Sequence, residues 1–158
     1  VIENLLPKLS ALVVGGGMAY TFLKAQGKQI GNSKLEEDKI DLARDILKQA
    51  QEKNVEILLP VDHVITQEID PNASTKIVGE DIPDGWMGLD SGPETNAAFA
   101  EVIAQSKTIL WISIWRSNGF GWRNTLSWFR TDNIIAYFNS KWNRTFLEFL
   151  IRAGPGVI

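Results

Sequence analysis

The chain has 158 residues, a hydrophobic fraction of 44% and a net charge of −3, which fit a soluble globular protein large enough to bury one ordinary core. It has no cysteine and a single histidine, which excludes a disulfide framework or thiolate metal site and leaves little for a histidine-based zinc site or a Ser-His-Asp triad. No run approaches the roughly 18 apolar residues of a membrane span and no signal-peptide pattern opens the chain, so we expect a cytoplasmic protein.

The chain opens with VIENLLPKL, without Met and as though within a helix, which suggests a piece of a longer protein. LSALVVG then predicts a buried strand, and GMAYTFLKAQG predicts a helix with Phe22 and Leu23 facing inward and Gly27 at its end.

Three consecutive glycines, Gly15, Gly16 and Gly17, separate this strand from this helix. Glycine permits positive φ and close backbone approach, and a helix N-terminus offers N–H groups to an anion. However, GGGMAY matches neither G-x-G-x-x-G nor the P-loop pattern. These residues alone therefore leave two interpretations open, a tight strand-to-helix turn or the floor of a nucleotide site.

The next helix is predicted from a capping box, with Ser33 at the N-cap and Glu36 three residues later. Apolar residues follow at helical spacing and predict one buried face: Ile40, Ala43, Ile46, Leu47 and Ala50. Asn54 is expected to close the helix.

Strands and one further helix follow. VEILLPVD is predicted as a strand that Pro60 stops, HVITQEI and STKIVGED as short extended pieces, and KTILW as a buried strand. Pro93 begins a predicted helix over GPETNAAFAEVIAQS. We expect His63 at the surface or at a strand end rather than as a general base. Strands alternating with helices predict an α/β fold with a mainly parallel sheet.

A second glycine-punctuated stretch, IPDGWMGLDSGPET, is predicted as a turn-rich loop that contains the apolar residues Trp86, Met87 and Leu89. Such a loop either packs these side chains under the fold or presents them as a flat slot for a planar aromatic ligand. Both interpretations stay open.

The composition changes after Trp111. Residues 1–111 contain 10 Lys/Arg and 17 Asp/Glu, whereas residues 112–158 contain 6 and 2. The tail shows no sustained helical or strand period, and it holds four of the six tryptophans: Trp115, Trp122, Trp128 and Trp142. A basic, aromatic-rich tail suits single-stranded nucleic acid, but a second small packing unit or a shifted reading frame explains it as well.

The two glycine-rich stretches, together with IGNSKLEEDKIDLA, ILLPVD and QSKTILW, resemble phosphoglycerate kinase. The resemblance covers about residues 1–111 and matches the first part of the family's C-terminal, nucleotide-binding domain. It implies a Rossmann-like three-layer fragment of a cytoplasmic glycolytic kinase that transfers a phosphoryl group between 1,3-bisphosphoglycerate and ADP with Mg²⁺.

Carried over residue by residue, the resemblance implies that Gly15, Gly16 and Gly17 line the adenine pocket. Met87, Gly88 and Leu89 would form its opposite wall. Lys34 stands where the family usually has Leu, so we expect it to perturb the pocket without abolishing it, with its methylenes over the ring and its ammonium in water. In the alternative, Leu35 takes the wall position.

No catalytic or metal-binding residue is assigned, because the family's phosphate-binding segments are not recognisable. The GGAKVSDK-type segment would precede VIENLL, NGPMGVFE is replaced by ISIWRSNGFGW, and the GGGD loop with its magnesium-linked Asp and the STGGGAS helix start are absent. Asp62 and Asp90 are interpreted as loop-shaping residues.

We therefore expect a chain that holds ADP or ATP at the base but is inactive alone. The glycerate substrates, 3-phosphoglycerate or 1,3-bisphosphoglycerate, belong to the full-length family enzyme. The alternatives are a non-catalytic binding or interaction module and, with less support, a nucleic-acid binder. The abrupt change at Trp111 favours a shifted frame or an alternative terminus. If the tail is genuine, we expect a sheet without its later strands, with an exposed edge and a tendency to self-associate.

Overall fold

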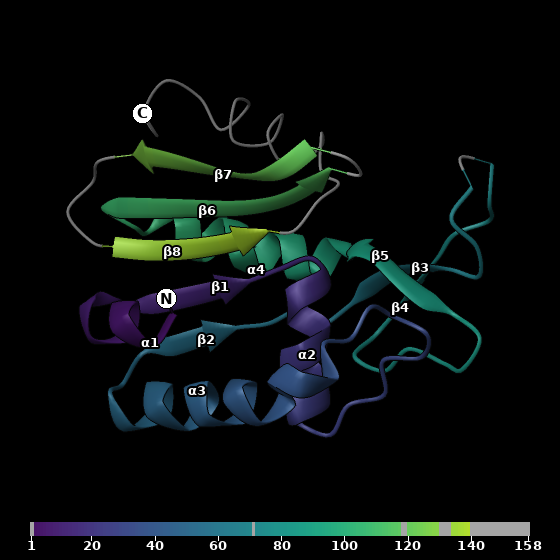
Figure 1. Cartoon of the computed structure of the whole chain (residues 1–158), viewed down its shortest axis with the longest axis horizontal. Helices are drawn as coiled ribbons and strands as arrows, with labels where there is room; N and C mark the ends of the chain where they lie inside the picture. Colours follow the sequence, from purple (N-terminus) through teal and green to yellow (C-terminus); the bar gives the residue numbers. More distant parts are fainter. Residues whose placement is uncertain (1, 71, 118–119, 130–133, 140–158) are drawn as a thin grey trace.

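The computed structural model describes residues 2–70, 72–117, 120–129 and 134–139, and describes side chains as far as Leu110 (Figure 1). Its main sheet has five strands in the order β2-β1-β8-β6-β7, and every neighbouring pair is parallel except β6 and β7. The strands are β1 (Ala11–Val14), β2 (Glu56–Leu58), β6 (Thr108–Ser117), β7 (Phe120–Phe129) and β8 (Ile134–Asn139). The prediction of an α/β fold with a mainly parallel sheet is confirmed.

Helices cover both faces of this sheet (Figure 1). Because side chains alternate along a strand, Leu12 and Val14 of β1 pack in one core cluster with residues of α2 (Gly17–Ala25) and α3 (Ile40–Glu52). Ala11 and Val13 point the other way and share a second cluster with residues of α4 (Pro93–Ala104). All four β1 side chains are buried, so β1 is the centre of a Rossmann-like three-layer unit. Two short helical segments, α1 (Ile2–Leu5) and η1 (Leu6–Lys8), precede it.

Three short strands form a separate antiparallel sheet in the order β4-β3-β5: β3 (His63–Thr66), β4 (Lys76–Val78) and β5 (Met87–Ser91). The prediction of a turn-rich loop over IPDGWMGLDSGPET is therefore wrong for its central part. Glycine and aspartate give this segment little strand propensity, and it is pairing with β3 that makes it a strand.

The predicted capping box is also wrong. A 3₁₀ turn, η2 (Glu37–Lys39), comes first and α3 begins at Ile40. Ser33 does not cap this helix, because its hydroxyl accepts a hydrogen bond from the distant Gly88 amide. The buried face follows the predicted spacing, and Asn54, with φ 54°, ends the helical region as expected.

The C-terminal part of the main sheet differs from expectation. β6 continues past residue 111 to Ser117, β7 pairs with it, and β8 lies between β1 and β6. The expectation that the sheet lacks its later strands is therefore wrong for these residues, and so is the interpretation that they show no strand pattern. Aromatic and β-branched residues at successive positions hid the alternation of apolar and polar residues that marks a strand. The division at residue 111 stays a prediction, and the side chains on which nucleic-acid binding would depend lie outside the described residues.

Asp62, in the turn between β2 and β3, fixes the start of α4. The Asp62 carboxylate is nearly buried, with 4% exposure, and accepts hydrogen bonds from the backbone N–H groups of Thr95 (2.8 Å) and Glu94 (2.9 Å) and from the Thr95 hydroxyl. It thus satisfies donors of the first helical turn from outside the helix. Gly92 leaves room for it, because a Cβ there would lie 2.2 Å from Asp62 Oδ2.

These contacts also set the ionisation of Asp62. Burial alone would raise the pKa of this carboxyl, but the hydrogen bonds from Thr95 and Glu94 outweigh burial and hold the pKa below its ordinary value. The expected role of Asp62 as a loop-shaping residue agrees with this geometry.

We predict that Asp62→Ala lowers the free energy of unfolding by about 2–4 kcal/mol, because it leaves the buried first-turn donors without an acceptor. Urea unfolding measures this. The matched control is Asp41→Ala, which removes an exposed ion pair with Arg44 and should change stability by less than about 0.5 kcal/mol. Because the pKa of Asp62 is depressed in the folded state, its stabilisation is present above the ordinary aspartate pKa of about 4. The stabilisation is lost as pH falls from there through the lower pKa of the folded state.

Equal losses of stability in Asp62→Ala and Asp41→Ala would contradict this role.

Candidate functional site

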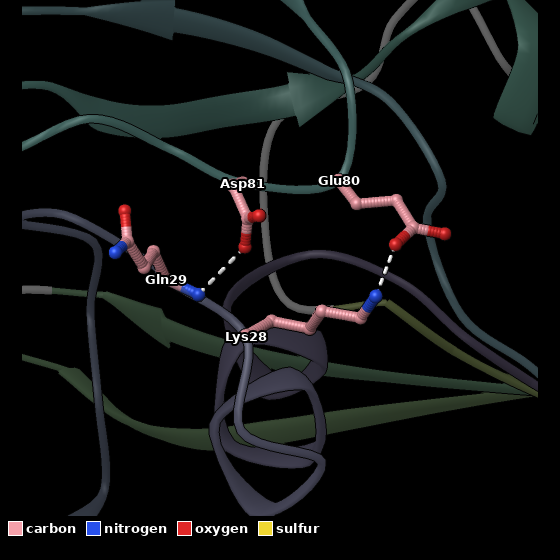
Figure 2. A network of polar contacts seen from close by, with 4 residues as sticks. All are labelled: Lys28, Gln29, Glu80 and Asp81. Atoms are coloured by element: carbon pink, nitrogen blue, oxygen red, sulfur yellow. Dashed lines mark hydrogen bonds and ion pairs between the residues drawn. The ribbon is translucent and has the colours of Figure 1, made fainter.

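A parallel seam joins residues 28–33, which follow α2, to residues 80–88, which lead into β5. At its start, Lys28 forms an ion pair with Glu80, and the Gln29 amide donates to Asp81 Oδ1 at 2.8 Å (Figure 2). Both contacts are exposed, so each adds little stability by itself. Their importance is that they set the register of the two segments.

The seam continues through backbone contacts. The Ile82 amide donates to the Gln29 carbonyl at 2.8 Å, Ile30 and Ile82 form a parallel bridge, and the Asn32 amide donates to the Trp86 carbonyl at 2.8 Å. Ile30 and Ile82 are both buried, so the middle of the seam belongs to the core.

Gly31 is required in the middle of the seam. Its φ is +50°, and a Cβ there would lie 2.4 Å from the Trp86 carbonyl oxygen and 2.5 Å from that of Pro83. Any other residue would push the two segments apart.

The seam ends where the Gly88 amide donates to Ser33 Oγ at 2.9 Å. The next residue on each side is a predicted site residue, Lys34 on one and Leu89 on the other. The structure therefore brings these two, far apart in sequence, to the same end of the seam.

The predicted glycine floor lies at the N-terminus of α2. Gly16 occupies the N-cap position with φ 63°, a conformation suited to glycine, and no side-chain hydrogen bond caps the helix at this residue. Gly15 is buried, and Gly16 and Gly17 are half-buried. The tight strand-to-helix turn is therefore present, and it leaves the floor interpretation open.

Tyr20 connects this helix to the opposite wall. It lies one turn after Gly17, is 5% exposed, and packs directly against Gly88, where a Cβ would fall 1.9 Å from the tyrosine hydroxyl oxygen. Tyr20 thus joins α2, the helix that follows the three glycines, to the wall residue Gly88 of β5.

The surface of this region is open and partly apolar. Leu89 is 40% exposed, Met87 and Gly88 are half-buried, and Lys34 is exposed. Leu35 is half-buried and packs against the cluster that contains Tyr20 and its neighbours. Lys34, rather than Leu35, is therefore the more exposed of the two candidate wall residues.

Two ionisable groups near Gly88 are perturbed by burial. Burial raises the pKa of the Asp90 carboxyl, although hydrogen bonds from Ser91 partly oppose this. Burial also raises the pKa of the Tyr20 hydroxyl well above its ordinary range, and the negative charge of Asp90 adds to the effect. Across the described part of the chain, no group of three or more His, Asp or Glu residues is placed to hold a metal ion.

His63 was expected at the surface or at a strand end. It begins β3, so the strand-end alternative is confirmed, and with 1% exposure it does not lie at the surface. Its spacing of two residues from the buried Ile65 is a signal that could have placed it inward. Its ring lies 5.6 Å from that of Tyr20, and both ring nitrogens are buried without a hydrogen-bond partner.

A hollow of about 290 Å³ lies elsewhere, between the end of α2, the segment after β2, and α4. It is bordered by residues that include Lys28, Leu59, Pro60, Glu80 and Phe99. The predicted glycines, Lys34 and Met87–Leu89 do not line it, so it is separate from the candidate site.

Comparison with known proteins identifies the family. The family model described as phosphoglycerate kinase matches residues 1–114. The chain belongs to the phosphoglycerate kinase family. The phosphoglycerate kinase of Synechococcus elongatus is 53% identical over 112 residues, and that of Lactobacillus acidophilus is 52% identical over 111. These alignments cover 70% of this chain but only 28% and 27% of the relatives.

A solved phosphoglycerate kinase structure agrees. The enzyme from Coxiella burnetii has a TM-score of 0.67 and 41% identity, over 68% of this chain and 28% of that one. Relative to these phosphoglycerate kinases, the chain therefore spans a little over a quarter of their length. The resemblance predicted from the glycine-rich motifs is confirmed, and the family match ends three residues beyond Trp111. No described helix is long and apolar enough to cross a membrane.

We predict that Gly88→Ala lowers the free energy of unfolding by about 1–3 kcal/mol, because the added methyl overlaps the buried Tyr20 side chain. Thermal or urea unfolding measures the change. Gly79→Ala is the matched control, since a Cβ there meets nothing within 4 Å and should leave stability within about 0.5 kcal/mol. Indistinguishable curves for the two variants would show that Tyr20 does not restrict Gly88.

Proposed function

We propose that this chain is the base-holding part of a phosphoglycerate kinase nucleotide-binding domain and binds the adenine of ADP or ATP. The observation that carries the proposal is the position of Gly88, which contacts Ser33, next to Lys34, and Tyr20, on the helix that follows the three glycines. Family membership supports the same assignment.

The proposed site suits a planar base. Gly15, Gly16 and Gly17 would form a floor without side chains, while Met87 and the exposed Leu89 offer apolar contact. The Gly88 amide already donates to Ser33, so Gly88 would meet the base through backbone contact rather than through that N–H.

Lys34 would modify this wall. Its exposed side chain can lay its methylenes along the base while its ammonium stays hydrated. Burying that ammonium unpaired would cost several kcal/mol, comparable to micromolar binding energy. We therefore propose weakened but retained binding, with Lys34 at the surface of the pocket.

Phosphoryl transfer is proposed for the whole family enzyme and not for these 158 residues alone. That chemistry needs cations and donors around the transferred group, with Mg²⁺ neutralising phosphate charge. The described residues near the site offer the exposed Lys34 and the half-buried Asp90, which do not make a magnesium site. Mg²⁺ and the glycerate substrates, 3-phosphoglycerate or 1,3-bisphosphoglycerate, accordingly enter only through the family.

We predict saturable ADP binding to the wild-type chain by isothermal titration calorimetry. Gly88→Trp should weaken it by about tenfold or more, because the indole would overlap Tyr20 and fill the wall. Gly79→Trp places the same side chain in open space and should leave affinity unchanged. An absence of ADP binding to the folded wild-type chain would instead support the alternative, a structural or interaction module.

We also predict no turnover above buffer when the 158-residue chain alone is given ATP, 3-phosphoglycerate and Mg²⁺ in a coupled assay. A full-length phosphoglycerate kinase in the same reaction mixture serves as the positive control. Turnover near the roughly 1–100 s⁻¹ of ordinary kinases would refute the assignment of this chain as a base-holding part only.

A further inference from the structure

The candidate nucleotide wall rests on a buried pair of rings. Tyr20, from α2, packs against Gly88 of β5, and the ring of His63, from β3, lies 5.6 Å from the tyrosine ring at an interplanar angle of 42°. His63 also pairs directly with Ser91 in the β3–β5 register, and Ile65 pairs with Gly88. His63 is therefore connected to β5 in two ways, through the pairing of β3 with β5 and through the Tyr20 ring.

His63 lacks the contacts that a charged imidazole needs. Both ring nitrogens are buried and neither makes a hydrogen bond of good geometry, although the Glu80 backbone lies close enough to favour the charged ring, and the residue is 1% exposed. A neutral ring tolerates this better than an imidazolium, which would bring a second N–H donor and a charge that these surroundings do not satisfy. The folded arrangement, with the start of β3 shut off from water, therefore favours the neutral form of His63.

The described side chains around His63 do not supply acceptors for both N–H groups of a charged ring, and the Glu80 backbone can accept from only one of them. In the turn before β3, Asp62 is next in sequence, but its carboxylate already accepts from Thr95 and Glu94 at the start of α4. From β4, the side chain of Lys76 lies over the Trp86 ring, 3.8 Å from its centroid. Beyond β4, the Glu80 carboxylate is paired with Lys28.

Two further groups face this region from β5 and α2. Asp90, on β5, is partly buried and acts electrostatically on Tyr20, and Ser91 donates its amide to Asp90. Tyr20 presents its ring to His63. Burial lowers the pKa of the His63 imidazole, and the nearby Asp62 charge and Glu80 backbone oppose this without reversing it.

We propose that His63 and Tyr20 form a pH-sensitive support for the nucleotide wall, in which protonation of His63 displaces β5 and weakens nucleotide binding. Protonation can be accommodated if the start of β3 opens to water or if His63 draws Asp62 away from α4. Either movement shifts Ser91 and Gly88, which lie opposite β3 in the register. β5 is thus held in place at neutral pH and opens more often at mildly acidic pH. This inference rests on the proposed nucleotide site for its effect on binding, but not for the opening of β5.

The chain offers a clean test because His63 is its only histidine. The imidazole resonance in a proton NMR titration therefore belongs to one residue, and we expect its midpoint in the folded protein below the ordinary value of 6.5. Between about pH 7.5 and 5.5, hydrogen exchange corrected for its intrinsic pH dependence should show the opening of Met87–Ser91 rising by up to about tenfold. The amides of β1 serve as the internal control and should not change in the same way.

The matched variant is His63→Phe, which keeps a ring against Tyr20 and cannot titrate. On going from pH 7.5 to 5.5, ADP affinity should fall more for wild type than for His63→Phe. Because the titration of ADP itself affects both proteins equally, comparing them cancels its contribution. His63→Leu serves if His63→Phe does not fold, and the wild-type imidazole titration with its exchange profile decides the matter if neither folds.

Two results would overturn the proposal. One is an imidazole that titrates at or above 6.5 in the folded chain, and the other is a pH dependence of β5 opening that persists in the non-titrating variant. Failure of ADP to bind at neutral pH would instead reject the proposed nucleotide site, and the exchange of Met87–Ser91 would still decide whether His63 controls β5.

Discussion

The candidate site depends on the parallel seam between residues 28–33 and 80–88. The segment that follows α2 has no regular structure of its own and is held in place by contacts with residues more than fifty positions later. Its ends are polar and its centre is the buried pair Ile30 and Ile82. This register places Lys34 and Leu89 at the same end of the seam, next to the hydrogen bond between the Gly88 amide and Ser33.

Two buried polar arrangements hold the small sheet to the three-layer core in opposite ways. Asp62 is fully engaged, because its carboxylate accepts from the first turn of α4 and its own amide donates to the Thr95 hydroxyl. His63, the next residue, is buried without a hydrogen bond of good geometry at either ring nitrogen. Fully satisfied buried polar groups rigidify a structure, whereas an unpaired one costs stability. A stabilising and a costly buried group are therefore adjacent in sequence at the start of β3.

Sequence patterns predicted the elements whose burial is regular. β1, α2 and α4 follow from apolar runs, glycine and proline signals, and the buried face of α3 follows from its period. Two of the failures, at Ser33 and at β5, share one cause. Ser33 has the local chemistry of an N-cap and β5 has the composition of a loop, but long-range contacts with each other and with β3 decide both. The site itself was anticipated only through family resemblance, since no local pattern pairs residue 33 with residue 88.

The candidate site and the sheet edge beside it depend on different parts of this chain. The contacts that bring Tyr20, Ser33 and Gly88 together lie within the part that matches the phosphoglycerate kinase family. In open α/β sheets, ligands bind beyond the carboxyl ends of the parallel strands, and β1 reaches that edge at Val14, just before the glycines. There its parallel neighbour is β8, with Val14 opposite Phe138, from the part outside the family match. The contacts around the candidate site therefore lie within the family match, while the strand that pairs with β1 at the glycine turn comes from residues beyond it.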